Sequence, residues 1–574
     1  MNTPIIAVVA AWLLVASSAS AEPAPIVDSK ARFHPVLARS GMVASQERVA
    51  SEVGAAILAQ GGNAIDAAVA TGFALAVTLP RAGNLGGGGF MLVYLAEQQR
   101  TVAIDYREMA PRSANADMFL DGEGNVDNQR ARYSIDSTAV PGTVAGLLHA
   151  LEQYGTLTRQ QVLAPAIALA SEGITVSPDL SESLQARAER LLADPVTAGY
   201  FFRADGSAPE VGSTLVQSDL AKTLTRISQQ GRKDFYQGTT ADLLVASIAS
   251  HDGQLDHRDL ADYQVVERQP VCGSYRANTV CAMPPPSSGG IHLIQMLNIL
   301  ENWDLRSLGH NSAAYLHRLI ESMRRAYADR SRYLGDPDFY PVPVLRLTDK
   351  RYAAQLAAQV ELDRATDSEQ VAPGLELNES LETTHYSSWD RWGNVVSNTY
   401  TLNFSYGNGK SVAGAGFLLN NEMDDFSAKK GAANGFGLLG EEANQIEPYK
   451  RPLSSMTPTI VFNSEGAPLM ATGSPGGSTI ITVVLQTLLN HLEFGMNIAE
   501  ATAAARIHHQ WWPDKVFWEK GVGDDTQEIL RNMGHTLEQS PRVLGATQTI
   551  GQQGPWLHGA ADYRRSEAAA AGAD

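Results

Sequence analysis

The sequence is poor in cysteine, in basic residues and in long apolar runs, and each shortage excludes a class of protein. Two cysteines among 574 residues cannot build a disulfide-rich scaffold or a cysteine-rich metal site. Lys and Arg number 44 against 62 Asp and Glu, and the net charge of −18 repels phosphate backbones. We therefore expect no nucleic-acid partner. With 44% hydrophobic residues the chain can bury a large core, which excludes a disordered protein.

One apolar run stands at the N-terminus, where twelve residues from Ile5 to Ala16 precede the small residues Ala19-Ser20-Ala21. The run is shorter than the roughly 20 residues that cross a bilayer as a helix. Its order is typical of a secretory signal peptide cut after Ala21, and a buried N-terminal helix is the alternative. No later segment is apolar for long enough to span a membrane, so we expect residues 1–21 to be removed and the protein to be periplasmic or secreted.

The two cysteines lie on either side of a predicted hairpin turn, between the β-rich runs VVERQPVC and NTVCAMP. Partners across a hairpin have residue numbers with a constant sum, and Cys272 and Cys281 are partners if the turn is centred between Arg276 and Ala277. A short cross-strand disulfide is then geometrically possible in an oxidising compartment. Two free buried thiols are an equally good interpretation, and neither is catalytic.

Apolar periodicity predicts helices between Ala44 and Leu79, with a turn at 61–63, and mostly helix from Thr143 to about Leu260. Two strands, FMLVYLA and TVAIDYRE, follow the glycine run of NLGGGG. That run is not a phosphate loop, because no GK[ST] follows and it enters a strand. The segment from Glu361 to Glu382 holds seven acidic residues and one basic residue without periodicity, which is typical of solvated chain.

A strongly β-forming stretch, TTHYSSWDRWGNVVSNTYTLN, begins at Thr383 and is typical of a hairpin. If Trp392 is the centre of its turn, Thr383 faces Thr401 at the open end. Cutting the chain between Glu382 and Thr383 would create a catalyst, because a threonine hydroxyl needs a base within hydrogen-bond reach. The new α-amine of Thr383 would be that base, since it titrates at about 7.7–8.0. Thr-rich hairpins are usually plain strands, so this pattern alone is weak evidence.

Further polar and glycine-rich segments strengthen the catalytic interpretation. Gly476 and Gly477 begin a predicted long apolar helix, where backbone N–H groups can stabilise an oxyanion, although a turn that needs glycine is the simpler alternative. The segments NNEMDDFS and RPLSSMTP supply clustered polar groups, each of which alone would more often be a turn or a cap. These groups are Glu422, Asp425, Ser454 and Ser455.

With these segments the sequence resembles the gamma-glutamyltransferase (gamma-glutamyltranspeptidase) family of N-terminal-nucleophile hydrolases. The matching stretches occur in the family's order from about Val43 to Asp562. They are AIDYREMAPR, MPPPSSGGIH, YADRSRYLGDPDF, TTHYS, NTYTLN, LLNNEMDDFS, KRPLSSMTPTIV, TGSPGGS and HHQWWPD. SAKKGAANGFGLLGE matches the lid loop of some bacterial members, with Phe436 where the familiar lid has tyrosine.

The resemblance implies an α+β fold, a four-layered αββα sandwich made from one precursor. A large subunit, residues 22–382, and a small subunit, residues 383–574, would associate as a heterodimer after cleavage between Glu382 and Thr383. The resemblance implies no cofactor and no metal, since His385, His508 and His509 fall in family motifs without a metal role. The substrates it implies are glutathione and other gamma-glutamyl compounds, with water, an amino acid or a dipeptide as the acceptor.

The resemblance also implies a role for each candidate residue. Thr383 would be the nucleophile of both cleavage and turnover, Thr401 would orient it, and Gly476 and Gly477 would form the oxyanion hole. Arg107 would bind the α-carboxylate of the substrate through its guanidinium fork, although a surface ion pair with Glu108 is the alternative. The other substrate contacts would be Asn403, Glu422 and Asp425 for the α-ammonium and Ser454 and Ser455 at the carboxylate end.

Two other functions compete with this one. A related acylase of the same fold would remove a glutaryl or similar acyl group from a β-lactam and would not need to recognise an α-ammonium. Asn403, Asp425 and the lid favour gamma-glutamyl substrates over that alternative. A periplasmic solute-binding protein for glutathione, with a merely structural hairpin, is the remote alternative from a different class.

Overall fold

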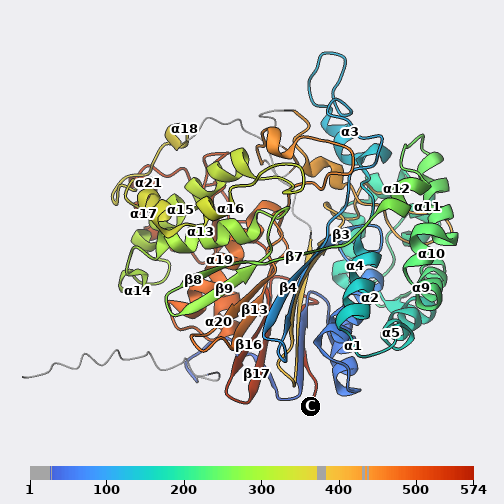
Figure 1. The fold of residues 1–574 in the computed structure, drawn as a ribbon, viewed down its shortest axis with the longest axis horizontal. Coiled ribbons are helices and arrows are strands. Elements are labelled where there is room, and N and C mark those ends of the chain that lie inside the picture. The colour runs from blue at the N-terminus through green and yellow to red at the C-terminus, as the bar shows by residue number, and fades with distance from the viewer. Residues whose placement is uncertain (1–25, 27–28, 372–382, 430–433, 436–437) are drawn as a thin grey trace, which may run out of the picture.

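Two seven-stranded antiparallel sheets lie face to face in the computed structural model, which describes residues 26, 29–371, 383–429, 434–435 and 438–574. Helices cover the outer side of both sheets (Figure 1). This is the four-layered αββα arrangement that the resemblance implies. The expected signal peptide, Glu382 and Phe436 lie outside the described residues. Among the helices of the described ranges, none combines the length and the apolar character that a membrane span requires.

The first sheet has the strand order β1-β17-β16-β13-β12-β9-β8. Its β8–β9 hairpin pairs Cys272 directly with Cys281, and the two form a disulfide. The turn is therefore centred where the sequence predicts, and the disulfide is the correct one of the two interpretations. The strands are β1 (Val36–Ala38), β17 (Trp556–Ala561), β16 (Gln548–Gln553), β13 (Pro468–Thr472), β12 (Thr459–Phe462), β9 (Asn278–Ala282) and β8 (Val271–Tyr275).

The second sheet has the order β18-β2-β10-β11-β3-β4-β7 and carries the predicted hairpin at its centre. Each sheet contains strands from before and from after position 383, so the two parts of the chain share both sheets. The strands are β18 (Ala569–Gly572), β2 (Gly41–Ser45), β10 (Thr384–Asp390), β11 (Val395–Thr401), β3 (Gly88–Leu95), β4 (Arg100–Tyr106) and β7 (Val266–Arg268).

Strands β10 and β11 are buried along their whole length although they are rich in Ser, Thr and Asn. Buried hydroxyls need hydrogen-bond partners, and several find them across the gap between the sheets. The Ser397 hydroxyl donates to the Thr472 carbonyl at 3.0 Å, and the Ser387 hydroxyl donates to the Gln548 carbonyl at 3.1 Å. Polar hydrogen bonds therefore fix the hairpin against the first sheet.

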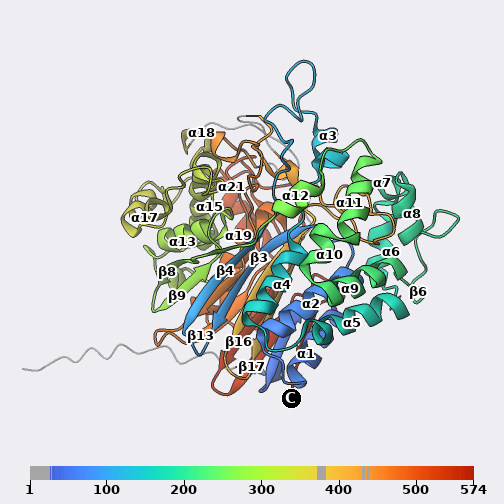
Figure 2. The same cartoon turned by 45° about the vertical axis from the view of Figure 1, so that its right-hand side comes forward.

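Helices α1, α2 and α4 pack on the outer face of the second sheet, and further helices pack behind them (Figures 1 and 2). Gly61 has φ 94° in the predicted turn between α1 and α2. Asn63 and Asp66 then form a capping box that begins α2. The helices of this side are α1 (Arg48–Ala59), α2 (Ala64–Thr78), α4 (Thr143–Tyr154), α5 (Arg159–Glu172), α9 (Ser218–Gln230), α10 (Arg232–Gln237), α11 (Thr239–Ala249) and α12 (His257–Asp262).

A second helical layer packs against the first sheet, with α13, α15 and α19 contributing to one apolar core with it. Helix α13 begins directly after the PPPSS segment, as predicted, and α19 begins shortly after the glycine pair at 476–477. The main helices here are α13 (Gly289–Leu300), α15 (Ala313–Tyr333), α17 (Lys350–Ala357), α19 (Ile480–Leu492), α20 (Ile498–Ala503) and α21 (Asp524–Asn532).

Candidate active site

The open end of the β10–β11 hairpin brings the two candidate threonines together. Thr384 pairs with Tyr400, which is the register that the sequence predicts, and Thr383 is the next residue outward. The hydroxyl oxygens of Thr383 and Thr401 lie 3.4 Å apart, and the two residues are 4% and 2% exposed. Thr401 Oγ1 also accepts a hydrogen bond from the Asn403 amide at 2.8 Å. The Thr383 hydroxyl is therefore held beside Thr401 at the edge of a rigid sheet.

Arg107 follows directly on strand β4 and binds two carboxylates from a distant part of the chain. Its guanidinium donates to Glu422 through one terminal nitrogen and to Asp425 through the other. Both acids lie in a short 3₁₀ helix, Glu422–Asp425. Glu108 lies 3.6 Å from the guanidinium, and both members of that pair are buried. The surface ion pair considered for Arg107 and Glu108 is therefore wrong, because Arg107 is an interior residue.

Burial dominates the electrostatics of this cluster. It disfavours ionised carboxyl groups, and it raises the pKa of Glu422 and of Asp425 despite the opposing attraction of Arg107. Burial likewise raises the pKa of Glu108 to about 7. Burial also opposes the charge of Arg107, but the three acids outweigh it and raise the Arg107 pKa above its ordinary value. Arg107 thus carries a permanent positive charge, while its three carboxyl neighbours ionise only at a higher pH than usual.

Asn403 turns the chain away from β11 and leaves an acceptor unused. It has φ 73°, a left-handed conformation that asparagine tolerates better than most residues. Its side-chain amide donates to the Asn421 carbonyl at 2.9 Å, while its Oδ1 has no hydrogen-bond partner. Glu422 Oε2 is also buried without a partner. Two unsatisfied acceptors in one buried place are suited to a ligand that donates hydrogen bonds, such as an ammonium group.

The glycine pair stands between β13 and α19, with a short 3₁₀ turn, Gly477–Thr479, before the helix. Gly476 and Gly477 have φ values of 133° and 53°, so both take backbone conformations that L side chains rarely adopt. The sequence predicts glycines at the first turn of the helix itself, and the structure inserts this turn. Glycine is therefore required at both positions because of the backbone conformation there.

Nearly all the candidate residues line one cavity. It is bordered by Thr383, Thr401, Asn403, Arg107, Glu422, Asp425, Ser454, Ser455 and Gly477. Leu438, Met456 and Ile480 supply apolar surface. Gly476 is adjacent in sequence but is not among the lining residues, and Glu382 lies outside the described residues. A threonine hydroxyl, an acidic cluster, a guanidinium and two serines are thus gathered from segments more than 300 residues apart.

The sequence model of the gamma-glutamyltranspeptidase family matches residues 50–572 of this chain. The chain belongs to this family. It is 48% identical over 562 residues to a glutathione hydrolase proenzyme of Escherichia coli (strain K12), and this match covers 97% of the chain and 96% of that relative. The match to the family along nearly the whole length of the chain thus decides its membership.

Solved structures agree with the family. The Helicobacter pylori gamma-glutamyltranspeptidase has a TM-score of 0.57 at 45% identity, and the match covers 60% of this chain and 97% of that one. A cephalosporin acylase from Bacillus halodurans has a TM-score of 0.83 at 26% identity and covers 94% of this chain and 97% of its own. The fold is thus common to gamma-glutamyltranspeptidases and acylases, while sequence identity is higher to the former.

One residue of this gamma-glutamyltranspeptidase site escaped the sequence prediction. Arg330, on α15, lines the cavity and is fully buried. It donates to the hydroxyl of Ser455 at 3.2 Å and to that of Ser288 at 3.0 Å. Burial lowers its pKa to about 10, and within the described ranges no carboxylate lies within ion-pair distance of it. Arg330 occurs in the YADRSRYLGDPDF stretch, and this family motif could have indicated a site residue. Nothing in the sequence links Arg330 to Ser455, however.

The histidines that could suggest a metal have other partners. His385 contacts the hydroxyls of Thr399 and Ser387, and burial lowers the pKa of His385 to about 3. Among the described residues, one group of three potential ligands comes within 4.8 Å, namely His317, Glu321 and His535. In that group the carboxylate of Glu321 already binds two arginines. The group is therefore a polar network inside the helical layer rather than an open metal site.

Proposed function

We propose that this member of the gamma-glutamyltranspeptidase family is a glutathione hydrolase and gamma-glutamyltransferase that uses Thr383 as its nucleophile. The observation that carries the proposal is the cavity in which the Thr383 hydroxyl faces Thr401 beside the cluster of Arg107, Glu422 and Asp425. An alcohol nucleophile and a recognition site for a charged amino-acid end are thereby combined. These are the two parts that transfer of a gamma-glutamyl group requires.

The first step is cleavage of the precursor between Glu382 and Thr383. The Thr383 hydroxyl oxygen attacks the Glu382 carbonyl carbon, the peptide C–N bond breaks, and an ester forms while the nitrogen becomes a free amine. Water hydrolyses the ester and restores the hydroxyl. Thr383 then carries its own base, since an α-amine titrates at about 7.7–8.0 and is partly neutral at working pH. One residue thus supplies both nucleophile and base.

The second reaction uses the same hydroxyl on the substrate. It attacks the gamma-glutamyl amide carbonyl, the amide C–N bond breaks, and the leaving amine takes a proton while a gamma-glutamyl ester remains on Thr383. Water, an amino acid or a dipeptide amine then attacks the ester. We assign stabilisation of the oxyanion to the segment of Gly476 and Gly477, where Gly477 shares the cavity with Thr383.

The charged end of the substrate would be held by the cluster. Its α-ammonium would donate to Asn403, Glu422 and Asp425, and the unused oxygens of Asn403 and Glu422 support this assignment. Its α-carboxylate would accept from Arg107 and from Ser454 and Ser455. Because Arg107 already binds Glu422 and Asp425, a zwitterionic ligand can insert with each of its charges beside an opposite one. Such a ligand leaves the net charge of the buried site unchanged.

Residues 22–382 and 383–574 would form the large and small subunits of the mature protein. After cleavage they would stay associated as a heterodimer, because each sheet contains hydrogen-bonded strands of both segments. Removal of residues 1–21 would deliver the protein to the periplasm or the exterior. The Cys272–Cys281 disulfide supports this, since disulfides persist in oxidising compartments.

Replacement of Arg107 by alanine tests the assignment of substrate recognition. The R107A variant should still be cleaved, because cleavage involves no substrate carboxylate, but its KM for gamma-glutamyl-p-nitroanilide should rise. An R107A protein that stays uncleaved, with normal turnover by any cleaved fraction, would contradict the assigned role.

The acylase alternative is tested with glutaryl-p-nitroanilide, which lacks the α-ammonium group. Faster turnover of this compound than of gamma-glutamyl-p-nitroanilide would favour the acylase function. A protein of full length that binds glutathione without consuming it would favour the solute-binding alternative.

A further inference from the structure

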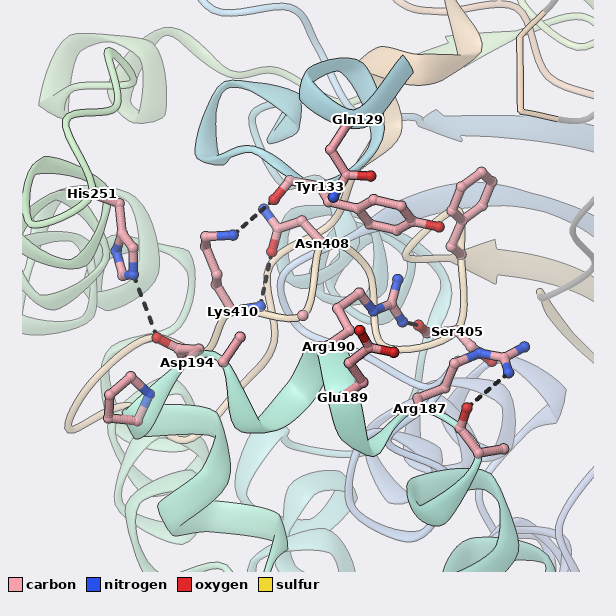
Figure 3. A pocket seen from close by; sticks show the side chains of 15 residues that line it. Gln129, Tyr133, Arg187, Glu189, Arg190, Asp194, His251, Ser405, Asn408 and Lys410 are labelled. Carbon is pink, nitrogen blue, oxygen red and sulfur yellow. Dashed lines mark hydrogen bonds and ion pairs between the residues drawn. The ribbon is translucent and has the colours of Figure 1, made fainter. Parts of the chain in front are cut away.

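A second and larger cavity lies beside the candidate active site. It is lined by α3 (Asn128–Tyr133), by α7 (Ala188–Leu192) with the residues before and after it, and by the loop that follows β11 (Figure 3). Its volume is about 710 Å³. The two cavities share this loop, because Thr401 and Asn403 line the active site while Phe404 and Ser405 line the larger cavity. The catalytic reaction as described makes no use of the larger cavity.

The larger cavity is positively charged in a protein of net charge −18. Arg187, Arg190 and Lys410 line it (Figure 3). Within the part of the chain that the structure describes, none of these three cations has a carboxylate within ion-pair distance. Lys410 donates instead to the Tyr133 carbonyl at 2.8 Å, and Arg190 donates to the Gly407 carbonyl at 3.1 Å. These cations are therefore held by neutral groups, and their charges stay available to an anion.

The acids around the cavity, Glu189 and Asp194, offset its positive charge only in part. Asp194 caps helix α8 (Pro195–Phe201), and its carboxylate accepts from the Thr197 amide at 2.9 Å and from the Thr197 hydroxyl at 2.7 Å. His251 lies 3.4 Å from the same carboxylate. Glu189 is exposed to solvent. The carboxylate that lies deepest is thus engaged by its own helix and its neighbours.

Burial makes the positive charges of Arg190 and Lys410 unfavourable without an anionic partner. Burial lowers the pKa of Arg190, and the neighbouring Arg187 lowers it further, while Tyr133 opposes this shift. Burial also lowers the pKa of Lys410, and Arg190 lowers it further, although the attraction of Asp194 opposes both. Arg190 Nε is buried without a hydrogen-bond partner. Each observation indicates a place where a bound anion would stabilise the protein.

We propose that this cavity binds the carboxylate of the amine half of the reaction, the dipeptide or amino acid that accepts the gamma-glutamyl group or leaves with it. The inference rests on the proposed function. Accepting and leaving amines occupy the same place, since one reaction is the reverse of the other. Phe404 and Ser405 follow Asn403 directly, and consecutive Cα atoms are about 3.8 Å apart. A dipeptide spans about 7 Å, which is comparable with the two Cα steps from Asn403 to Ser405, and we therefore place its amine at the acyl ester and its carboxylate at the larger cavity.

The test compares two acceptors that differ in one charge, glycylglycine and glycylglycinamide. The variants are Arg187→Gln and Lys410→Gln, with Lys410→Arg as the charge-conserving control and Lys222→Gln as a distant control. Lys222 is an exposed cation of α9 that pairs with Asp219. The donor is gamma-glutamyl-p-nitroanilide, whose leaving amine carries no carboxylate. Arg187 is exposed, so its replacement should leave the fold intact.

The KM for glycylglycine should rise roughly tenfold in K410Q and R187Q, as for the loss of a charge-assisted hydrogen bond. The KM for glycylglycinamide and the hydrolysis of gamma-glutamyl-p-nitroanilide should stay within about twofold, and K410R and K222Q should resemble the wild type. An equal effect on both acceptors, or no effect on either, overturns the proposal. If the wild type fails to release p-nitroaniline at all, the proposed function itself is wrong, and that outcome is distinct from the first two.

Discussion

Replacement of Asp425 by asparagine tests the recognition of the substrate ammonium most sharply. Asp425 lines the active-site cavity, and its buried carboxylate binds Arg107. Asparagine keeps the shape of the side chain but removes its charge. A hydrogen bond to a charged group contributes about 1.5–3 kcal/mol, and each 1.36 kcal/mol is a factor of ten in rate or affinity. We therefore expect kcat/KM for gamma-glutamyl-p-nitroanilide to fall roughly 10- to 150-fold.

The adjacent residue provides a matched control. Asp424 is also a buried acid of the same 3₁₀ helix, but its carboxylate faces Arg132 at 3.4 Å and accepts from the Gly435 amide at 2.8 Å. It does not line the cavity. The D424N variant should therefore change kcat/KM much less than D425N, although both remove one buried charge.

The assay compares initial rates on gamma-glutamyl-p-nitroanilide and on glutaryl-p-nitroanilide, with cleavage of each variant measured on a gel. Only the first substrate carries the ammonium group, so the ratio of the two kcat/KM values should fall in D425N and should hold in D424N. If D425N lowers turnover of both substrates equally, Asp425 supports the site through Arg107 rather than binding the ammonium. If D424N has the same effect as D425N, the assignment of roles within the helix is wrong.

Three further variants test other parts of the structure. Thr383→Ala should abolish cleavage and turnover together, because one hydroxyl serves both, and a cleaved T383A protein would contradict this. Glu321 has a pKa lowered to about 2, since Arg324 and Arg325 together with the Thr366 hydroxyl outweigh its burial. It therefore contributes about 3 kcal/mol above pH 4.5 that is lost as pH falls toward 2. Urea unfolding should show the wild type losing its advantage over E321Q across that range, and a constant difference would contradict it. Replacement of both cysteines of the Cys272–Cys281 bridge by serine should lower the free energy of unfolding by roughly 2–3 kcal/mol. The kcat should be unchanged, because neither cysteine lines the active-site cavity.

The local parts of the structure could be predicted from the sequence. The register of the β10–β11 hairpin follows from its turn, and it places Thr383 opposite Thr401 without any tertiary information. The same rule placed Cys272 opposite Cys281, although only the structure decides between a disulfide and free thiols. The alternation of apolar and polar residues, the turn residues and the helical periodicity all involve neighbours in the sequence. For this reason the sequence alone predicts these local features.

The long-range contacts could not be predicted in this way. Arg107 and Glu422 are separated by 315 residues, and only the packing of β4 against the segment after β11 brings them together. The family resemblance assigned Arg107 and the two acids to opposite ends of the substrate, and it gave no indication that they bind one another. Arg330 was missed for the same reason, because its contact with Ser455 spans 125 residues between α15 and a loop.

Mass spectrometry of the purified, active protein tests the central claim most directly. We expect two polypeptides, one of which begins Thr-Thr-His-Tyr at Thr383. Full activity in a single polypeptide that still contains the peptide bond between residues 382 and 383 would contradict it.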